Sequence, residues 1–221
     1  APTNDGALNV LCESLSLPRA DLAPFIGQLA ERQQQLLASL RGTTLNLKTF
    51  IPLLIKYQLS PEYPSYYAHR YLHEEQMGRE YLKKLDDDNR KNLDLYIENI
   101  YTMEELTRVQ ANLDLLKMHH EQNVAAGAET IEVEVVGLRV GDFVLVTFPG
   151  ELSVQMGLDL KRASPHERTF IAGVTNGYIY YTPTAQQLEN RGGAQEDSDC
   201  LLAVEWQQLF VAKALEILNR L

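Results

Sequence analysis

An acidic side chain stands where a predicted strand meets a predicted helix in the middle of the chain. The apolar run 143–148 predicts a buried strand, and the segment 149–153 (PGELS), which contains Glu151, predicts the start of a helix. In sheets flanked by helices, reactive groups collect outside the carboxyl ends of strands, and a helix N-terminus favours an ionised acid. Glu151 is therefore a candidate functional carboxylate. The alternative is a first-turn glutamate that stabilises its own helix by about 0.3–1 kcal/mol.

A second predicted strand ends in a cluster of tyrosines. The segment 169–174 (TFIAGV) predicts a strand, and it runs into 175–184 (TNGYIYYTPT), which contains Tyr178, Tyr180 and Tyr181. Two strand ends would thus present an acid and several phenols. The alternative is a tyrosine-rich strand edge whose rings only pack against each other.

These two segments, with the helix expected between them, resemble the neutral/alkaline (non-lysosomal) ceramidases, which are zinc amidohydrolases that cleave the N-acyl bond of ceramide. That family carries a strand followed by Pro-Gly-Glu, a helix, and a strand that ends in a Gly, Asn, Tyr and Thr motif. The motif stands here as GVTNGYIYYT at 173–182. The resemblance covers roughly residues 131–190. It implies that Glu151 and Tyr181 are oxygen ligands to zinc, and that Asn176 and Tyr178 shape the wall of the site.

The resemblance also implies what this chain lacks. The family's two histidine ligands fall upstream of residue 1, so we expect the C-terminal part of a longer zinc-dependent amidohydrolase, which is inactive alone and binds zinc only with those histidines. A further tyrosine of the family's active site falls near Gly192 and Gly193, where this chain has none. The expected substrate is therefore an N-acylated small molecule or a lipid-like linear amide, not necessarily ceramide. The intact protein is expected to be soluble, and secreted or periplasmic.

Two histidine pairs are weaker candidates for metal binding. His69 and His73 are four residues apart and share one face of a predicted helix, but they lack the His-Glu-x-x-His order of zinc proteases. A structural role is the better interpretation. His119 and His120 diverge by about 100° on a helix, so they cannot bind one ion together, and we interpret both as surface residues.

An acidic loop follows the two glycines near residue 192. It contains Glu189, Glu196, Asp197 and Asp199, which could bind a cation or an amine-bearing substrate. The alternative is a solvated loop whose residues 197–199 cap the final helix.

Hydrophobic periodicity predicts an α/β (α+β) fold, in which a helix-rich N-terminal half packs on a small mixed sheet with flanking helices. Residues 1–10 are small and polar, which predicts a mobile N-terminus. Composition divides the chain at Ala125 into a helical region, 1–125, and a strand-helix-strand region, 126–221, within one continuous domain. The predicted helices span 18–40, 65–79, 86–122 and 201–221, and the predicted strands 131–135, 143–148 and 169–174.

Composition excludes several classes of protein. With 221 residues, 45% hydrophobic and 23% charged, the chain is typical of a soluble globular protein. A net charge of -10 argues against nucleic-acid binding. No run of 18 or more apolar residues predicts a transmembrane helix, and Cys12 and Cys200 are too few for a disulfide framework. A rival hypothesis remains, because residues 1–125 contain no catalytic motif: a metal-free helical module that docks a partner or has a structural role.

Overall fold

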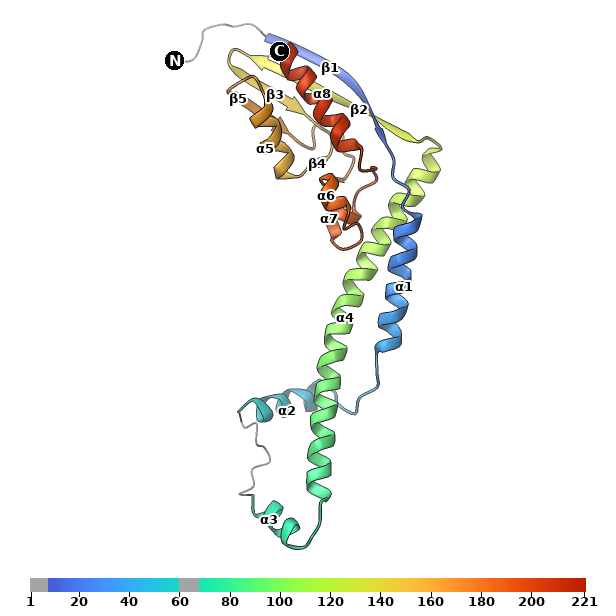
Figure 1. Cartoon of the computed structure of the whole chain (residues 1–221), viewed down its shortest axis with the longest axis vertical. Helices are drawn as coiled ribbons and strands as arrows, with labels where there is room; N and C mark the ends of the chain where they lie inside the picture. Colours follow the sequence, from blue (N-terminus) through green and yellow to red (C-terminus); the bar gives the residue numbers. More distant parts are fainter. Residues whose placement is uncertain (1–7, 60–67) are drawn as a thin grey trace. The chain divides into compact units, whose positions relative to one another are not determined.

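The computed structural model describes residues 8–59 and 68–221, which form an α+β fold with a helix-rich region and a small mixed sheet (Figure 1). This confirms the predicted fold class. The elements, in chain order, are β1 (Leu8–Pro18), α1 (Ala23–Ser39), α2 (Leu47–Leu59), α3 (His69–Gln76), α4 (Tyr81–Ala126), β2 (Thr130–Val140), β3 (Phe143–Thr147), β4 (Glu151–Leu152), α5 (Val154–Ala163), β5 (Arg168–Ala172), β6 (Tyr181–Thr182), α6 (Ala185–Leu188), α7 (Gln195–Ser198) and α8 (Trp206–Arg220).

The main sheet has the strand order β1-β2-β3-β5. β1 and β2 pair antiparallel over their whole length, from Leu8 opposite Val140 to Pro18 opposite Thr130. β3 is antiparallel to β2 and parallel to β5, so the most apolar strand lies inside the sheet, as its sequence predicts. β4 and β6 form a separate parallel pair beyond the ends of β3 and β5.

The main core lies between this sheet and α8. Val133 and Val135 of β2 are buried while Glu132 and Glu134 are exposed, so the predicted alternation along this strand is confirmed. The Phe148 ring at the end of β3 packs on Phe210 of α8, with ring centroids 4.2 Å apart. Each such buried side chain stabilises the fold by about 1.5–3 kcal/mol.

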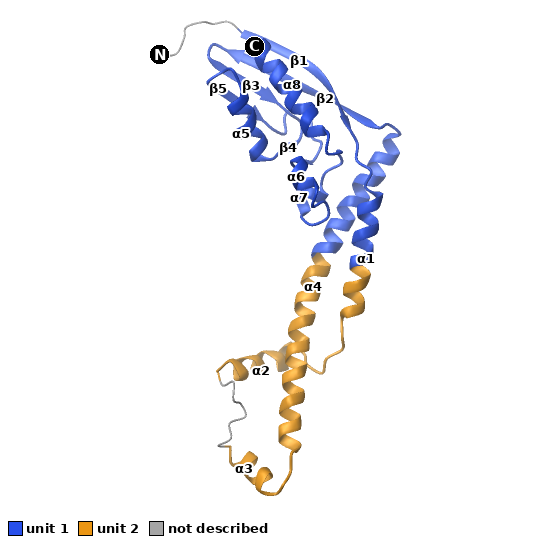
Figure 2. Cartoon of the chain, in the orientation of Figure 1, with its two compact units in different colours: residues 1–32, 108–221 blue, residues 33–107 orange. Residues whose placement is uncertain are grey.

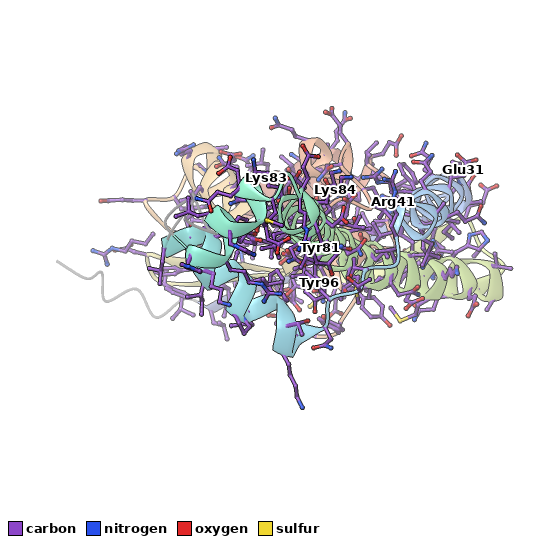
Figure 3. The ribbon with its side chains drawn as sticks, turned by 90° about the horizontal axis from the view of Figure 1, so that it is seen from below. Glu31, Arg41, Tyr81, Lys83, Lys84 and Tyr96 are labelled. Atoms are coloured by element: carbon purple, nitrogen blue, oxygen red, sulfur yellow. The ribbon has the colours of Figure 1, made fainter. Side chains whose placement is uncertain are left out.

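The chain divides into two compact units (Figure 2). Unit 1 contains the sheet and comprises the described residues up to Arg32 together with Arg108–Leu221, and unit 2 is Gln33–Thr107. The division at residue 125 drawn from composition falls inside unit 1, at the end of α4. Within unit 2, the core is built from Phe50 and Tyr57 of α2 and Leu93 of α4. Tyr96, labelled in Figure 3, stacks on Phe50 with ring centroids 4.4 Å apart.

Three expectations about the elements were wrong. Residues 8–18 form strand β1 and not a mobile terminus followed by a helix from residue 18; residues 1–7 lie outside the described part of the chain. Pairing with the eleven residues of β2 overrides the weak local signal. The long helix begins at Tyr81 and not at the aspartates 86–88, because Asp86 instead accepts a 2.6 Å hydrogen bond from the Tyr57 hydroxyl. The helix predicted over 65–79 covers only His69–Gln76 of the described residues.

Candidate functional site

The sequence predicted Glu151 in the first turn of a helix, but in the structure it lies in a short strand. It belongs to β4, and α5 begins three residues later, at Val154. The backbone N–H of Glu151 donates to the Tyr180 carbonyl at 2.9 Å, and its carbonyl accepts from the Thr182 hydroxyl at 2.9 Å. The β4–β6 pairing therefore fixes Glu151, and the helix dipole of α5 is not what holds it.

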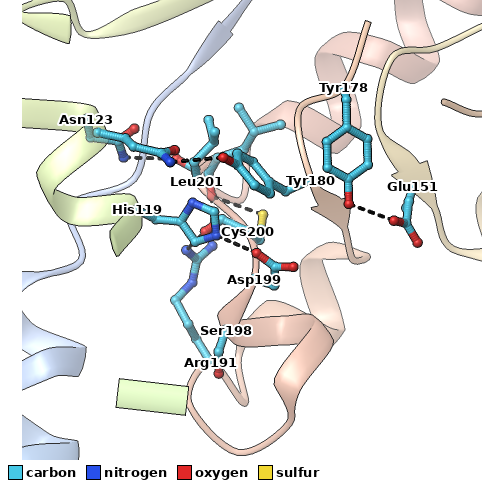
Figure 4. A network of polar contacts seen from close by, with 12 residues as sticks. His119, Asn123, Glu151, Tyr178, Tyr180, Arg191, Ser198, Asp199, Cys200 and Leu201 are labelled. Carbon is cyan, nitrogen blue, oxygen red and sulfur yellow. Dashed lines mark hydrogen bonds and ion pairs between the residues drawn. The ribbon is translucent and has the colours of Figure 1, made fainter. Parts of the chain in front are cut away.

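The structure brings Glu151 together with Tyr178 and Tyr181. Glu151 and Tyr181 are partners in the parallel β4–β6 register. The Tyr178 hydroxyl donates to Oε1 of Glu151 at 2.7 Å (Figure 4). Hydrogen bonding to Glu151 raises the pKa of Tyr178 to about 12, and the same cause raises the pKa of Tyr181. The carboxylate thus lies beside two protonated phenols. The sequence predicted this meeting of an acid and tyrosines at two strand ends.

The loop that precedes Tyr181 has an unusual backbone. Val174, Asn176 and Tyr180 all have positive φ angles, of 52°, 61° and 66°. Such a conformation is costly for a residue other than glycine, and most of all for a β-branched one. Strain of this kind clusters at functional sites, where the surrounding structure enforces it. Here the hydrogen bonds of Val174 to Gly150 and of Ile179 to Pro149 hold the loop against the β3–β4 connection.

The Asn176 side chain bonds to a residue of the main sheet. Its side-chain amide donates to Oε1 of Glu134, on the exposed face of β2, at 3.2 Å. The resemblance implies that Asn176 shapes the wall of the site, and in this structure its side chain ties the strained loop to the main sheet.

The C-terminal part of α4 contacts the tyrosine segment through His119 and Gln122. His119 is fully buried, and its Nε2 lies 2.6 Å from Oδ1 of Asp199 (Figure 4). The His119 ring packs edge-on against Tyr180, whose hydroxyl accepts from Gln122 at 2.9 Å. The interpretation of His119 as a surface residue was wrong. His119 follows the buried Leu116 by three residues, so it lies on the buried stripe of α4, a spacing that could have revealed it.

A buried arginine fixes the acidic loop. The guanidinium of Arg191 donates to the carbonyls of Cys200 and Leu202 at 2.9 and 2.7 Å. Burial raises the pKa of Asp197 and lowers that of Arg191. The loop acids do not cap the final helix, because α8 begins at Trp206 with Glu205 before it. The Asp199 carbonyl accepts from the backbone of Tyr181 at 3.1 Å, which links this loop to the site.

Two pockets meet at Glu151. The larger, of about 430 Å³, is walled mainly by apolar side chains of β4, α5 and the β5 end, with Lys161 beside them: Leu152, Val154, Leu158, Ile171 and Val174. The smaller, of about 190 Å³, lies between Glu151, Tyr181 and Glu196. A volume of a few hundred Å³ with few polar groups is typical of small-molecule sites.

The other candidates lie elsewhere. His69 and His73 are exposed on α3 in unit 2, whereas Glu151 and Tyr181 belong to unit 1. Among the residues that the structure describes, no group of three or more His, Cys, Asp or Glu side chains could hold a metal ion. Carboxylate and phenol oxygens suit zinc, but about four donors are typical of zinc sites. Glu151 and Tyr181 therefore fit part of a zinc site, not a complete one.

Comparisons with known proteins add little. No protein-family model and no curated protein sequence matches the chain. Two solved structures, one described as "Ceramidase complexed with C2" and the other the neutral ceramidase from Pseudomonas aeruginosa, each align with 41% of this chain at 25% identity and a TM-score of 0.34. This TM-score is too low to carry an argument about fold or function. The chain spans only 15% and 16% of the length of those two proteins.

Proposed function

We propose that this chain is the C-terminal part of a ceramidase-like, zinc-dependent amidohydrolase, to which it contributes Glu151 and Tyr181 as zinc ligands. The observation that carries the proposal is the register of β4 and β6, which places these two residues opposite each other beside the Tyr178 hydroxyl. A carboxylate enclosed by phenols at the ends of two parallel strands is the arrangement that the sequence motifs 149–151 and 173–182 predict.

Each residue of the cluster has a distinct task in this proposal. Glu151 and Tyr181 bind the metal, which when present lowers the pKa of a bound water and polarises an amide carbonyl. The Tyr178 hydroxyl orients the Glu151 carboxylate through their 2.7 Å hydrogen bond. His119 and Asp199 support the backbone of Tyr181 from the opposite side. Supporting contacts of this kind contribute about 10 to 100-fold to metal affinity or activity.

The larger pocket suits the apolar part of an N-acylated substrate. Its walls include the exposed side chains of Val154 and Leu158, and it adjoins the Glu151 carboxylate directly. An acyl chain lying there would bring its amide towards the metal ligands. The substrate class that we propose is therefore an N-acylated small molecule or a lipid-like amide.

Zinc titration of the 221-residue chain tests the ligand assignment. We expect weak binding, because two oxygen ligands leave a divalent ion mostly hydrated, and no amide hydrolysis. Glu151→Gln and Tyr181→Phe should each abolish that binding, whereas Glu189→Gln, an exposed acid outside the cluster, should leave it unchanged. Binding that survives both ligand substitutions would refute the assignment. Tight stoichiometric zinc would show a complete site and refute the expected need for upstream histidines.

A longer form of the protein that includes the upstream sequence gives the stronger test. Glu151→Ala there should strip the metal and abolish amidase activity while leaving thermal unfolding close to that of the chelator-treated wild-type protein, because the side chain is only half-buried and a bound metal itself stabilises the fold. Retained metal and activity would refute the proposal.

The rival function, a metal-free helical interaction module, is supported by a different observation. Unit 2 exposes large apolar side chains on α2, among them Leu47 and Leu59. If zinc has no measurable effect on either form of the protein, this function becomes the better interpretation.

A further inference from the structure

Helix α2 is apolar on almost all sides. Its inner face, with Phe50 and Tyr57, packs against α4 in the core of unit 2. Its outer face consists of four side chains spaced four residues apart: Leu47, Ile51, Ile55 and Leu59. A helix that is apolar all round is normally buried on all sides, yet these four side chains are 65%, 42%, 51% and 82% exposed.

The charges on α2 itself differ in sign from the net charge of the chain as a whole. The only charged residues on α2 are Lys48 and Lys56, both exposed. Residues 47–59 contain no Asp or Glu. The complete chain, in contrast, has a net charge of -10. The uncovered apolar stripe therefore lies on a helix whose charged residues are both basic.

We propose that the outer face of α2 docks on a lipid surface that carries anionic headgroups. An interfacial helix lies in the plane of the membrane, with apolar side chains in the acyl boundary and lysines at the headgroups. Leu47 to Leu59 supply the apolar stripe over about 18 Å at 1.5 Å per residue, and Lys48 and Lys56 supply the charge. None of the described helices is long and apolar enough to span a bilayer. The contact is therefore a surface one.

Charge favours this occupant over a second copy of the chain. In a symmetric dimer the outer faces of two α2 helices would meet, and each α2 would bring two lysines, Lys48 and Lys56, and no acidic side chain of its own. Like charges facing each other destabilise such a contact. An anionic headgroup layer instead attracts each basic residue near the surface by a factor of about five in affinity. The proposal does not depend on the zinc site, which belongs to unit 1.

Cosedimentation of the 221-residue chain with vesicles tests the proposal. One set of vesicles is pure phosphatidylcholine, and the other contains about one third phosphatidylserine. We expect binding to the anionic vesicles, weakened by raised salt, and much weaker binding to the neutral ones. Ile51→Gln with Ile55→Gln should reduce binding at least about tenfold, and Lys48→Gln about fivefold on anionic vesicles only.

A matched pair of substitutions separates this face from general hydrophobicity. Tyr101→Gln with Met103→Gln removes two side chains of α4 that are 68% and 59% exposed, and should leave vesicle binding unchanged. Circular dichroism checks that both double variants keep their helices, and Lys48→Gln tests the face without altering its apolar residues. No binding to either vesicle, or equal loss in both double variants, would overturn the proposal. The proposal would also be overturned if light scattering showed a dimer and the double substitution Ile51→Gln with Ile55→Gln dissociated it.

Discussion

Replacing Arg191 by methionine should destabilise unit 1 by about 2–4 kcal/mol. The Arg191 side chain is only 7% exposed, and its two hydrogen bonds satisfy the carbonyls of Cys200 and Leu202. Methionine cannot donate, and each buried acceptor left without a partner costs about 1–3 kcal/mol. Part of this cost is offset, because burial lowers the Arg191 pKa, which shows that the charged form is itself desolvated. The lower part of the summed range is therefore expected.

The single tryptophan makes this measurement specific to unit 1. Trp206, the first residue of α8, is fully buried in the core of unit 1, so its fluorescence during urea unfolding reports on this unit and not on unit 2. Arg162→Met is the matched control, because the Arg162 side chain is 71% exposed and its ion pair is with Asp159 on its own helix. This substitution should change the free energy of unfolding by less than about 0.5 kcal/mol. A loss below about 1 kcal/mol for Arg191→Met would refute the claim that Arg191 anchors the loop.

Three further predictions test separate parts of unit 1. Gly137→Ala should destabilise unit 1 by about 1–3 kcal/mol in urea unfolding, since a Cβ there would overlap Ile217 of α8. Gly157→Ala on α5, where a Cβ meets open space, should be neutral or stabilising by up to about 1 kcal/mol. Equal effects of the two substitutions would contradict the packing described. Glu151→Ala, which removes the acceptor, should lower the pKa of Tyr178 from about 12 towards about 10 in chelator-treated protein, followed by NMR of ring-labelled tyrosine with Tyr178→Phe as the assignment control. An unchanged titration would exclude the hydrogen bond to Glu151 as its cause. In the native chain a thiol reagent should modify the exposed Cys12 quickly and the buried Cys200, whose pKa burial raises, only after unfolding; rapid loss of two thiols from the folded protein would contradict this.

The strands of unit 1 were largely predictable because their signals are local. The alternation from Ile131 to Val135 and the apolar run 143–148 place β2 and β3, and both strands are found there. The proximity of Glu151 to the tyrosines followed from a topological rule, since parallel neighbouring strands end at the same edge. The structure satisfies that rule through β3 and β5, with β4 and β6 continuing it.

The parts of the site that escaped prediction depend on contacts between distant residues. His119 and Asp199 are 80 residues apart, and nothing in the sequence around either one indicates the other. β1 has no strong strand pattern and becomes a strand because β2 offers a complete partner. The positive φ of Tyr180 likewise arises where its hydroxyl bonds Gln122 and its ring meets His119. Tertiary contacts, which single-sequence patterns do not encode, set all three features.

The hydrogen bonds around Glu151 explain why the chain alone should bind zinc only weakly. Hydrogen bonding to Glu151 raises the pKa of Tyr181 above its ordinary value. A phenol must lose its proton to become a zinc ligand, and with an ordinary pKa of about 10 fewer than about one molecule in 1,000 has done so at pH 7. The raised pKa of Tyr181 opposes this ionisation further, so the charge of a bound cation must drive it. Two oxygen ligands contribute too little binding free energy to offset the ionisation of Tyr181, whereas two additional imidazole ligands would contribute enough.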